Sequence, residues 1–394
     1  MERRKRILVA GGSHSEMPVI EAAKNQGYYV ITTGNDSDAI GHRIADKYVA
    51  GDYSDKEFIY YLAESEHVEG IVSGANDFSY ISVSYACEKL GLKGHDTFEN
   101  ARKIHIKDEF RKLQQELGIK SPTVRKYYGT ELTEDIGRDV TFPVVVKPVD
   151  LTGGKGVEVC NNLEKLHIAI TKAKEVTRED YVIIEDYIEG TPHGFSSIIK
   201  DGRVVWHMID NEQYGENKYL VLGAFSPSDV PQHVEYTLIN DIEKIAEKCG
   251  LVDGLFHVQF ILDKTGYPVM IDPCRRMPGD LYVLLAKYTT GVDIPHEIIK
   301  HETYCTDETR YVYKHRFVAR ECIMGDKSGI IKDVFVDQTV KEKMVYSYYR
   351  DFKGEALDDP LKYKAGIIIM SFDSYSEMIK MVKNFRKLVH IEME

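Results

Sequence analysis

The 394-residue sequence has no hydrophobic run long enough to cross a membrane. A membrane-spanning helix needs about 18 or more apolar residues, whereas the longest apolar runs, such as 366–370, have the length of a strand. The basic start of the chain is followed by the short apolar run 7–10 and then by glycine, whereas a signal peptide needs a longer apolar region and a small-residue cleavage site. We therefore expect a cytoplasmic protein without a membrane partner.

Paired cysteines and a surplus of basic residues are also missing. The six cysteines are scattered singly and form no CxxC pair, which argues for reduced thiols and against a disulfide framework or a structural zinc site. Lys and Arg number 51 against 63 Asp and Glu, so the net charge is −12. A nucleic-acid-binding protein usually has the opposite balance or a basic stripe, so we expect no nucleic-acid partner.

The composition is that of a globular protein, with 43% apolar and 29% charged residues, and the length predicts two or three domains. In the first hundred residues, short apolar runs at 7–10, 28–33 and 68–73 alternate with helical patterns at 17–26 and 80–90. Strands separated by helices favour a parallel, doubly wound α/β sheet.

The rest of the chain has a different style. The Asp-Gly pair at 201–202 lies between two apolar runs and predicts a hairpin, and a second hairpin is predicted over 257–272. Helical patterns cover 235–248 and 376–388, and further strands are predicted at 316–323 and 366–371. We find no internal repeat and no long linker, so we expect the domains to pack together.

The glycines at 11 and 12 lie in the strand-to-helix turn where a dinucleotide-binding fold holds its pyrophosphate. The fingerprint GxGxxG is missing, and no acidic residue closes the second strand cleanly. We interpret this turn as a tight packing turn. A nucleotide site here, and with it an NAD(P)-dependent oxidoreductase, is an alternative interpretation.

A lysine and a glycine-rich segment in the middle of the chain point to phosphate binding. Lys147 ends a strand bounded by prolines, and Gly153-Gly154-Lys155-Gly156 follows within ten residues. A glycine-rich loop can lay backbone N–H groups against phosphate oxygens, and a lysine on a rigid strand supplies positive charge to the same phosphates. The segment is not a Walker A loop, because the GK[ST] motif is missing, and taken alone it also fits a surface hairpin.

Two further segments add to this pattern. Residues 182–190 form a strand that leads into a polar linker, whose backbone groups can pair with an adenine edge. The predicted hairpin strands present Gln259, Asp272 and Cys274 toward one cavity, with Arg276 just past the strand end.

In this order, these motifs resemble the ATP-grasp enzymes of the carboxylate–amine ligase type, which include biotin carboxylase, carbamoyl-phosphate synthetase, glycinamide ribonucleotide synthetase and the L-amino-acid ligases. The segments 101–110 and 118–122 resemble the linker-helix signature of that family. The resemblance implies an α/β (α+β overall) ATP-grasp fold. Its expected parts are a Rossmann-like pre-ATP-grasp domain (1–97), a linker helix (98–122), a lid subdomain (123–190), a large subdomain (191–304) and a small carboxy-terminal α+β region (305–394).

The resemblance also assigns roles to individual residues. Lys147 and Arg276 are implied as catalytic residues, and Arg276 is expected to face the transferred phosphate or the substrate carboxylate. The residues implied to contact ATP are Lys107, Lys147, Gly153, Gly154, Lys155, Gly156, Glu185, Asp186, Ile188 and His193. Among these, Lys107 and Lys147 are assigned to the α- and β-phosphates, and His193 lies near the ribose contact of the family.

The metal ligands implied by the resemblance are Asp272 and Gln259, and they depart partly from the family pattern. Gln259 stands where an acidic ligand is usual, and Cys274 stands where an asparagine is usual. A neutral amide holds Mg²⁺ less well than a carboxylate does, and cysteine is a poor ligand for it. The consequence is a loosely held metal, a metal held mainly by nucleotide phosphates, or a protein that binds ATP without efficient turnover.

The function implied by the resemblance is ATP-dependent formation of a C–N bond between a carboxylate and an amine, through an acyl phosphate. The expected cofactors are ATP and Mg²⁺, with Mn²⁺ as an alternative metal. From their positions, we expect Arg275, Asp280, Tyr282 and Asp77 to contact substrate and the stretches 211–219 and 223–227 to border the cavity. A purine-biosynthetic ligase of the glycinamide ribonucleotide synthetase type and a catalytically degenerate ATP-binding scaffold are alternatives, and a homodimer is expected because dimers are common among relatives.

Overall fold

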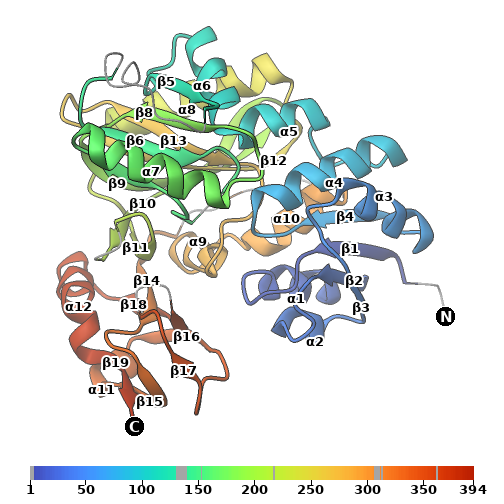
Figure 1. Cartoon of the computed structure of the whole chain (residues 1–394). Helices are drawn as coiled ribbons and strands as arrows, with labels where there is room; N and C mark the ends of the chain where they lie inside the picture. The colour runs from blue at the N-terminus through green and yellow to red at the C-terminus, as the bar shows by residue number, and fades with distance from the viewer. Residues whose placement is uncertain are drawn as a thin grey trace.

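The computed structural model describes residues 4–129, 140–151, 153–215, 218–305, 311, 314–360 and 363–394. Its strands form four sheets, with four, four, eight and three strands. Figure 1 shows the amino-terminal unit beside the largest sheet, and the carboxy-terminal region extending away from both.

The amino-terminal unit is a parallel sheet with helices on both faces. Its strands are β1 (Arg6–Ala10), β2 (Tyr29–Gly34), β3 (Lys47–Ala50) and β4 (Gly70–Ser73), in the order β3-β2-β1-β4. The connecting helices are α1 (Met17–Asn25), α2 (Ile40–Ile44), α3 (Lys56–Ser65) and α4 (Asp77–Leu90). Apolar side chains on both faces of β1 are fully buried, as in a sheet covered by helices. The predicted parallel α/β sheet is confirmed.

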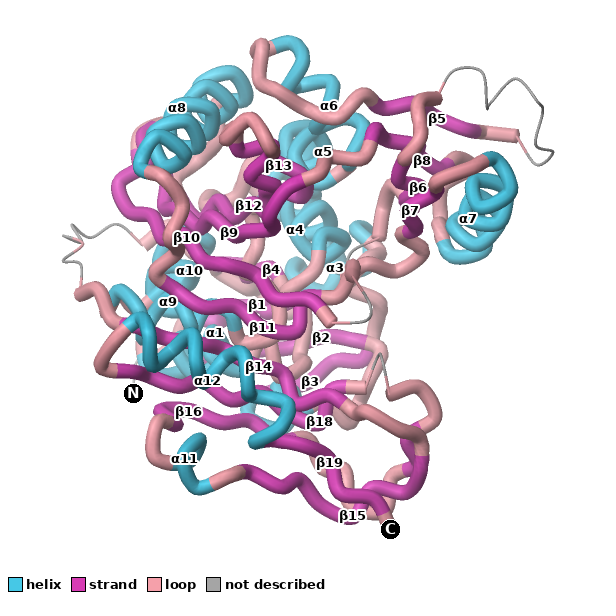
Figure 2. Tube along the Cα trace, turned by 90° about the vertical axis from the view of Figure 1, so that its left-hand side faces the viewer, coloured by secondary structure: helices cyan, strands magenta, loops and turns pink. Residues whose placement is uncertain are grey.

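Two short helices lead into a second four-stranded sheet. Helices α5 (Phe98–His105) and α6 (Lys107–Glu116) precede an antiparallel sheet of order β5-β8-β6-β7. Its strands are β5 (Val124–Tyr127), β6 (Val144–Pro148), β7 (Glu158–Cys160) and β8 (Val182–Asp186), and helix α7 (Leu163–Val176) packs on it. We call this sheet with α7 the lid sheet. In Figure 2 it lies beside the strands of the large sheet.

The large sheet is antiparallel, with the order β13-β12-β9-β10-β11-β14-β18-β16. Its strands are β9 (Gly190–Lys200), β10 (Arg203–Tyr214), β11 (Val221–Ser226), β12 (Gly254–Asp263), β13 (Pro268–Cys274), β14 (Phe317–Met324), β16 (Met344–Tyr349) and β18 (Lys364–Phe372). Helix α8 (Gln232–Cys249) covers one face of β9, β12 and β13. Helices α9 (Tyr282–Thr290) and α10 (Ile294–Glu302) share a core with the amino-terminal unit. The large sheet therefore combines strands from the expected large subdomain (191–304) with strands from the expected carboxy-terminal region (305–394).

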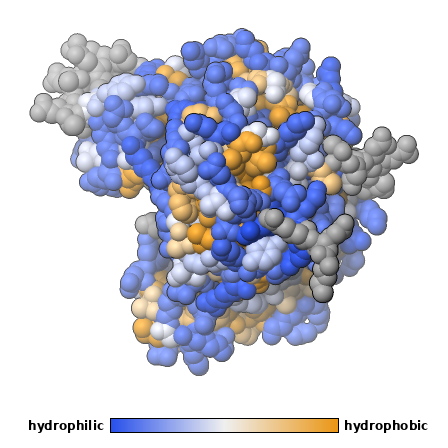
Figure 3. Space-filling view, turned by 90° about the vertical axis from the view of Figure 1, so that its right-hand side faces the viewer, coloured by the Kyte–Doolittle hydropathy of each residue, from blue (hydrophilic) through white to orange (hydrophobic). Residues whose placement is uncertain are grey.

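The carboxy-terminal region completes the fold with a three-stranded sheet of order β17-β15-β19. Its elements are β15 (Gly329–Val336), α11 (Gln338–Lys341), β17 (Ala356–Leu357), α12 (Tyr375–Leu388) and β19 (Val389–Met393), which enclose their own core with β14 and β18. No helix within the described ranges is both long and apolar enough to cross a membrane. The face shown in Figure 3 is mainly hydrophilic with a few apolar areas, which is ordinary for a globular protein.

Candidate active site

A cavity of about 870 Å³ lies between the lid sheet and the large sheet. It extends to the β1–α1 turn at Ser15 and to Arg320 and Lys364 of the carboxy-terminal region. The predicted site residues that line it are Lys107, Lys147, Gly153, Gly154, Glu185, Asp186, Ile188, Gln259, Asp272, Cys274, Arg276, Asp280 and Tyr282. Segments more than 160 residues apart in the sequence therefore meet around one space.

Lys147 and Glu185 form a buried ion pair on neighbouring strands of the lid sheet. Lys147 Nζ lies 2.6 Å from one Glu185 carboxylate oxygen, and Arg111 Nε lies 2.8 Å from the other. Burial alone would raise the pKa of Glu185, but the charges of Arg111 and Lys147 lower it to about 2. Glu185 is therefore charged at neutral pH, and it holds the ammonium group of Lys147 at the cavity wall.

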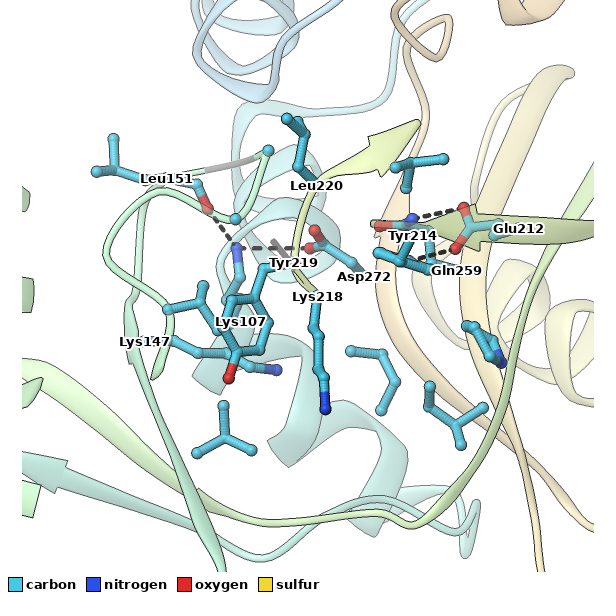
Figure 4. A pocket seen from close by; sticks show the side chains of 18 of the residues that line it. Lys107, Lys147, Leu151, Glu212, Tyr214, Lys218, Tyr219, Leu220, Gln259 and Asp272 are labelled. Atoms are coloured by element: carbon cyan, nitrogen blue, oxygen red, sulfur yellow. Dashed lines mark hydrogen bonds and ion pairs between the residues drawn. The ribbon is translucent and has the colours of Figure 1, made fainter. Parts of the chain in front are cut away.

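Lys107 connects Leu151, just before the glycine-rich loop, to the large sheet (Figure 4). It is the first residue of α6, and its Nζ donates a hydrogen bond of 2.8 Å to the carbonyl oxygen of Leu151. The same Nζ lies 3.5 Å from Asp272 Oδ1. One buried ammonium group thus contacts both sides of the cavity.

The predicted metal ligands lie side by side. Gln259 on β12 and Asp272 on β13 are direct partners across the strands, so their side chains project from the same face of the sheet. Cys274 is buried, and burial raises the pKa of its thiol to about 12, so it is a neutral group that does not suit Mg²⁺. No cluster of three His, Cys, Asp or Glu side chains suited to a metal is found in the described part of the chain. A hard cation here would be held by the Asp272 carboxylate, the Gln259 amide oxygen and the phosphates of a nucleotide.

Arg276 reaches the cavity from a buried hydrogen-bonded chain. Its Nε donates to Asp77 Oδ1 at 2.9 Å, and His105 Nδ1 lies 2.9 Å from the same oxygen. The backbone N–H of Arg275 donates to His105 Nε2, so the neutral ring carries its proton on Nδ1 and donates it to Asp77. Burial would raise the pKa of Asp77, but the charge of Arg276 and the hydrogen bond from His105 hold it well below its usual value. Asp77, which we expected to contact substrate, is thus the counter-ion of Arg276 and does not line the cavity.

The structure places two other predicted site residues away from the cavity. The guanidinium of Arg275 is buried, and it donates to Asp96 at 2.8 Å and to the carbonyl oxygens of Leu255 and Val252. His193 lies on the opposite face of β9, where its ring stacks on Phe260 at 5.2 Å, because side chains alternate along a strand and Pro192 takes the cavity side.

The predicted ATP contacts in the glycine-rich loop also differ in whether they line the cavity. Gly153 and Gly154 line the cavity, whereas Lys155 is exposed and does not. A Cβ on Gly156 would meet Pro148 and Val176, so this glycine packs against the lid sheet itself.

Several lining residues were not predicted individually. Glu212, Tyr214 and Tyr219 lie in the stretch expected to border the cavity, while Arg320 and Lys364 come from the carboxy-terminal region. Asp280, which was predicted, is an ion-pair partner of Lys364. The available signal for Arg320 was the pair of charged residues, Arg320 and Glu321, in the middle of an otherwise apolar strand.

Behind the cavity wall, Tyr282 contacts a buried acid that does not itself line the cavity. Tyr282 OH donates to the Asp210 carboxylate, and burial raises the pKa of Asp210 to about 7. Burial likewise raises the pKa of Glu212, against hydrogen bonds from Tyr214 and Gln259 that lower it.

Residues 140–281 match the family model of the ATP-grasp domain. Over 261 residues the chain is 23% identical to "Carbamoyl phosphate synthase large chain, C-terminal section" of Methanopyrus kandleri, which covers 61% of this chain and 46% of that protein. The chain thus spans less than half the length of this curated relative. The fold is similar to an L-amino acid ligase from Bacillus licheniformis, with a TM-score of 0.83, 17% identity and full coverage of both chains. It is also similar to the biotin carboxylase domain of a Hydrogenobacter thermophilus 2-oxoglutarate carboxylase, solved with MgADP, with a TM-score of 0.77, 20% identity and coverage of 100% and 91%.

Proposed function

Because the chain carries an ATP-grasp domain over residues 140–281, we propose that it is an ATP-dependent carboxylate–amine ligase. In the proposed reaction, an oxygen of the substrate carboxylate attacks the γ-phosphorus of ATP, and ADP leaves. An amine then attacks the acyl phosphate and displaces inorganic phosphate, which forms the C–N bond. The observation that carries this proposal is the meeting of Lys107, Lys147 and Asp272 around one cavity that Gly153 and Gly154 of the β6–β7 loop also line.

The cationic side chains around the cavity suit the binding of a triphosphate. Lys107, Lys147 and Arg276 are each held by a carboxylate, at 3.5, 2.6 and 2.9 Å. Fixed cations of this kind stabilise charge on a transferring phosphoryl group without reorganising during the reaction. We assign Lys107 and Lys147 to the ATP phosphates and Arg276 to the reacting carboxylate or the transferred phosphoryl group.

Asp272 and Gln259 are the proposed protein ligands of Mg²⁺, because both offer oxygen donors on one face of the sheet. When bound, Mg²⁺ would neutralise charge on the phosphate oxygens. Cys274 is the observation that favours the second candidate, a degenerate scaffold, because a neutral buried thiol replaces the expected third ligand.

The amino-terminal turn gives no support to an oxidoreductase. The buried Glu16 carboxylate occupies this turn, where it accepts hydrogen bonds from Ala75 N–H at 2.7 Å and Ser13 Oγ at 2.6 Å. A buried carboxylate at the start of α1 opposes the binding of a pyrophosphate there, since both are anionic. The ligase type, the cytoplasmic location and a homodimer stay predictions.

The test is calorimetric titration of ATP into the full chain, with and without Mg²⁺, for the wild type and Asp272→Asn. We expect Mg²⁺ to strengthen ATP binding to the wild type, and Asp272→Asn to remove that gain because the anionic ligand is lost. The matched control is Asp373→Asn, since that carboxylate is 93% exposed and is paired with Lys343 on the surface. If the ATP affinity changes neither with Mg²⁺ nor in Asp272→Asn, the result favours the scaffold. If the chain does not bind ATP at all, the result contradicts the proposal. A screen for ADP release with pairs of acids and amines follows a positive result.

A further inference from the structure

A third side chain joins Gln259 and Asp272 at the proposed metal position (Figure 4). Glu212 on β10 accepts a hydrogen bond of 2.6 Å from Gln259 Nε2 on one oxygen and one of 2.6 Å from Tyr214 OH on the other. Strand β9 lies between β10 and β12, and the residue of β9 paired with Gln259 is Gly194. The residue of β10 paired with Gly194 is Asp210, two positions before Glu212, so the Gln259 and Glu212 side chains meet diagonally across β9 on the same face of the sheet.

The hydrogen bond determines which end of the Gln259 carboxamide faces the cavity. A carboxylate only accepts hydrogen bonds, whereas a carboxamide donates through nitrogen and accepts through oxygen. With Nε2 bound to Glu212, the amide oxygen is turned away from Glu212. Asp272 flanks Gln259 on the other side, on strand β13. Among the described residues this amide oxygen has no hydrogen-bond partner, so it and the Asp272 carboxylate are available together to one cation.

We infer that Glu212 is a positioning residue, which orients the Gln259 carboxamide so that its oxygen can bind the metal of a metal–ATP complex. This inference rests on the proposed function. It explains how a neutral glutamine serves where a carboxylate is usual in the family, because the negative charge is supplied one hydrogen bond further from the cation. Partners of this kind fix the orientation of a ligand and add to its affinity for the metal.

The pairing also makes residues 212 and 259 interdependent. A glutamate at position 259 would place two carboxylates against each other, which is unfavourable for like charges. If residue 212 is a glutamine at the same time, its amide can donate to the new carboxylate, and the hydrogen bond is restored with its direction reversed. The inference therefore predicts that exchanging the two side chains is tolerated better than either single change.

The experiment measures the binding of Mn²⁺ to the full chain saturated with ADP, by electron paramagnetic resonance of free Mn²⁺. The variants are Glu212→Gln, Gln259→Glu and the exchange Glu212→Gln/Gln259→Glu, with Glu99→Gln as control because the Glu99 side chain is 77% exposed. We expect Glu212→Gln to weaken Mn²⁺ binding by about 10- to 100-fold, which is typical of losing such a partner. ADP affinity without metal should stay at the wild-type value, and the exchange should recover most of the Mn²⁺ affinity.

The possible results separate the inference from the proposed function. If the wild type binds ADP and Mn²⁺ but Glu212→Gln keeps the wild-type Mn²⁺ affinity, the inference is wrong and the ligase proposal stands. Failure of a folded exchange variant to recover affinity would also overturn it, because Glu212 would then not act through Gln259. If the wild type does not bind ADP together with Mn²⁺, both the inference and the ligase proposal are overturned.

Glu212→Asp provides a second measurement if Glu212→Gln does not fold. It keeps the charge and withdraws the carboxylate from Gln259 by one methylene. We expect weaker Mn²⁺ binding with unchanged metal-free ADP affinity, and an unchanged Mn²⁺ affinity contradicts the inference.

Discussion

At the scale of single residues, the cavity is built from charges that hold one another in place. Glu185 is shared between Lys147 and Arg111, and Asp77 is bound to Arg276. Removing one member of a buried pair leaves the other charge without compensation, which costs more than the loss of an exposed pair. The same contacts that aim the cations at the cavity therefore also stabilise the fold.

This leads to a prediction for Asp77→Asn, which keeps the size of the side chain and removes its charge. We expect the free energy of unfolding to fall by about 3 to 5 kcal/mol, because the buried Arg276 guanidinium loses its counter-ion. Urea denaturation followed by circular dichroism measures the change. The control is Asp333→Asn, whose carboxylate is 49% exposed and 3.3 Å from Lys353, and for which we expect a much smaller loss. Equal losses in the two variants would contradict the role of Asp77.

The sequence predicted which residue types would surround the cavity better than it predicted their partners. Arg276 was expected there and lines it, whereas Asp77 and Arg275 were expected to contact substrate and do not line it. The hydrogen bond between Arg276 and Asp77 joins residues 199 positions apart. No local pattern contains that pairing, since it depends on how the amino-terminal unit docks against β13.

At the scale of the structural elements, two neighbouring glycines of the lid sheet differ in a way that can be measured. Gly153 and Gly154 have φ values of 68° and 71°, so alanine is strained at either position. A Cβ on Gly154 would also lie 2.3 Å from the carbonyl oxygen of Tyr219, whereas nothing lies within 4 Å of a Cβ on Gly153. The loop can therefore keep its position against the Tyr219 segment only with glycine at 154.

We expect Gly154→Ala to weaken the binding of ATP with Mg²⁺ by about tenfold or more, because the clash adds to the backbone strain of roughly 1 kcal/mol. Gly153→Ala is the matched control, since it carries the strain without the clash, and its affinity should fall by less. Calorimetry under the conditions used for the wild type gives both values. The same loss of affinity in the two variants would show that the contact with Tyr219 is unimportant.

Elements with a clear local signal were predicted well. The Asp201-Gly202 pair joins β9 to β10, with positive φ at both residues, and the helix expected at 235–248 is α8 at 232–249. Helix α9 was not predicted, because nearly all of its residues are buried and it has no polar face to produce a helical period. The sequence also carries no signal for the start of this helix, since Leu281 before it has a φ of 58° and provides no side-chain cap.

At the scale of the whole molecule, buried polar groups join the amino-terminal unit to the rest of the chain. Glu302 at the end of α10 accepts hydrogen bonds from the N–H and Oγ of Ser73 on β4, at 2.6 and 2.9 Å. Close by, Arg275 is bound to Asp96. These contacts connect the amino-terminal unit to α10 and to the residue that follows β13. The stability of this junction therefore depends on the protonation of its acids.

The last prediction concerns this junction and pH. Burial raises the pKa of Glu302 from the ordinary 4.5 to about 8, even though Ser73 and Arg275 lower it. His95, 3.7 Å away, stays neutral above about pH 4, because burial lowers its pKa to about that value. Between pH 4.5 and 8 the folded chain therefore holds a proton on Glu302 that the unfolded chain has released. The free energy of unfolding must then fall as the pH rises through this window, and it changes no further once both states are ionised.

Glu302→Gln, which cannot ionise, should remove this part of the pH dependence. We expect wild type and variant to have similar stability near pH 5, and the variant to be more stable at pH 8 by up to a few kcal/mol, at about 1.4 kcal/mol for each unit of pKa shift. Urea denaturation at pH 5, 6.5 and 8 measures the two slopes.

Part of the pH dependence should remain in the variant, because burial also raises the pKa of Asp210 to about 7 and that of Glu321 to about 8. The control is Glu377→Gln, at a side chain that is 37% exposed. Its pKa is lowered by Lys343, so it contributes no loss of stability between pH 5 and 8. Parallel curves for the wild type and Glu302→Gln would mean that Glu302 is already ionised in the folded chain at pH 5, and that the junction is held by a charged carboxylate instead of a neutral one.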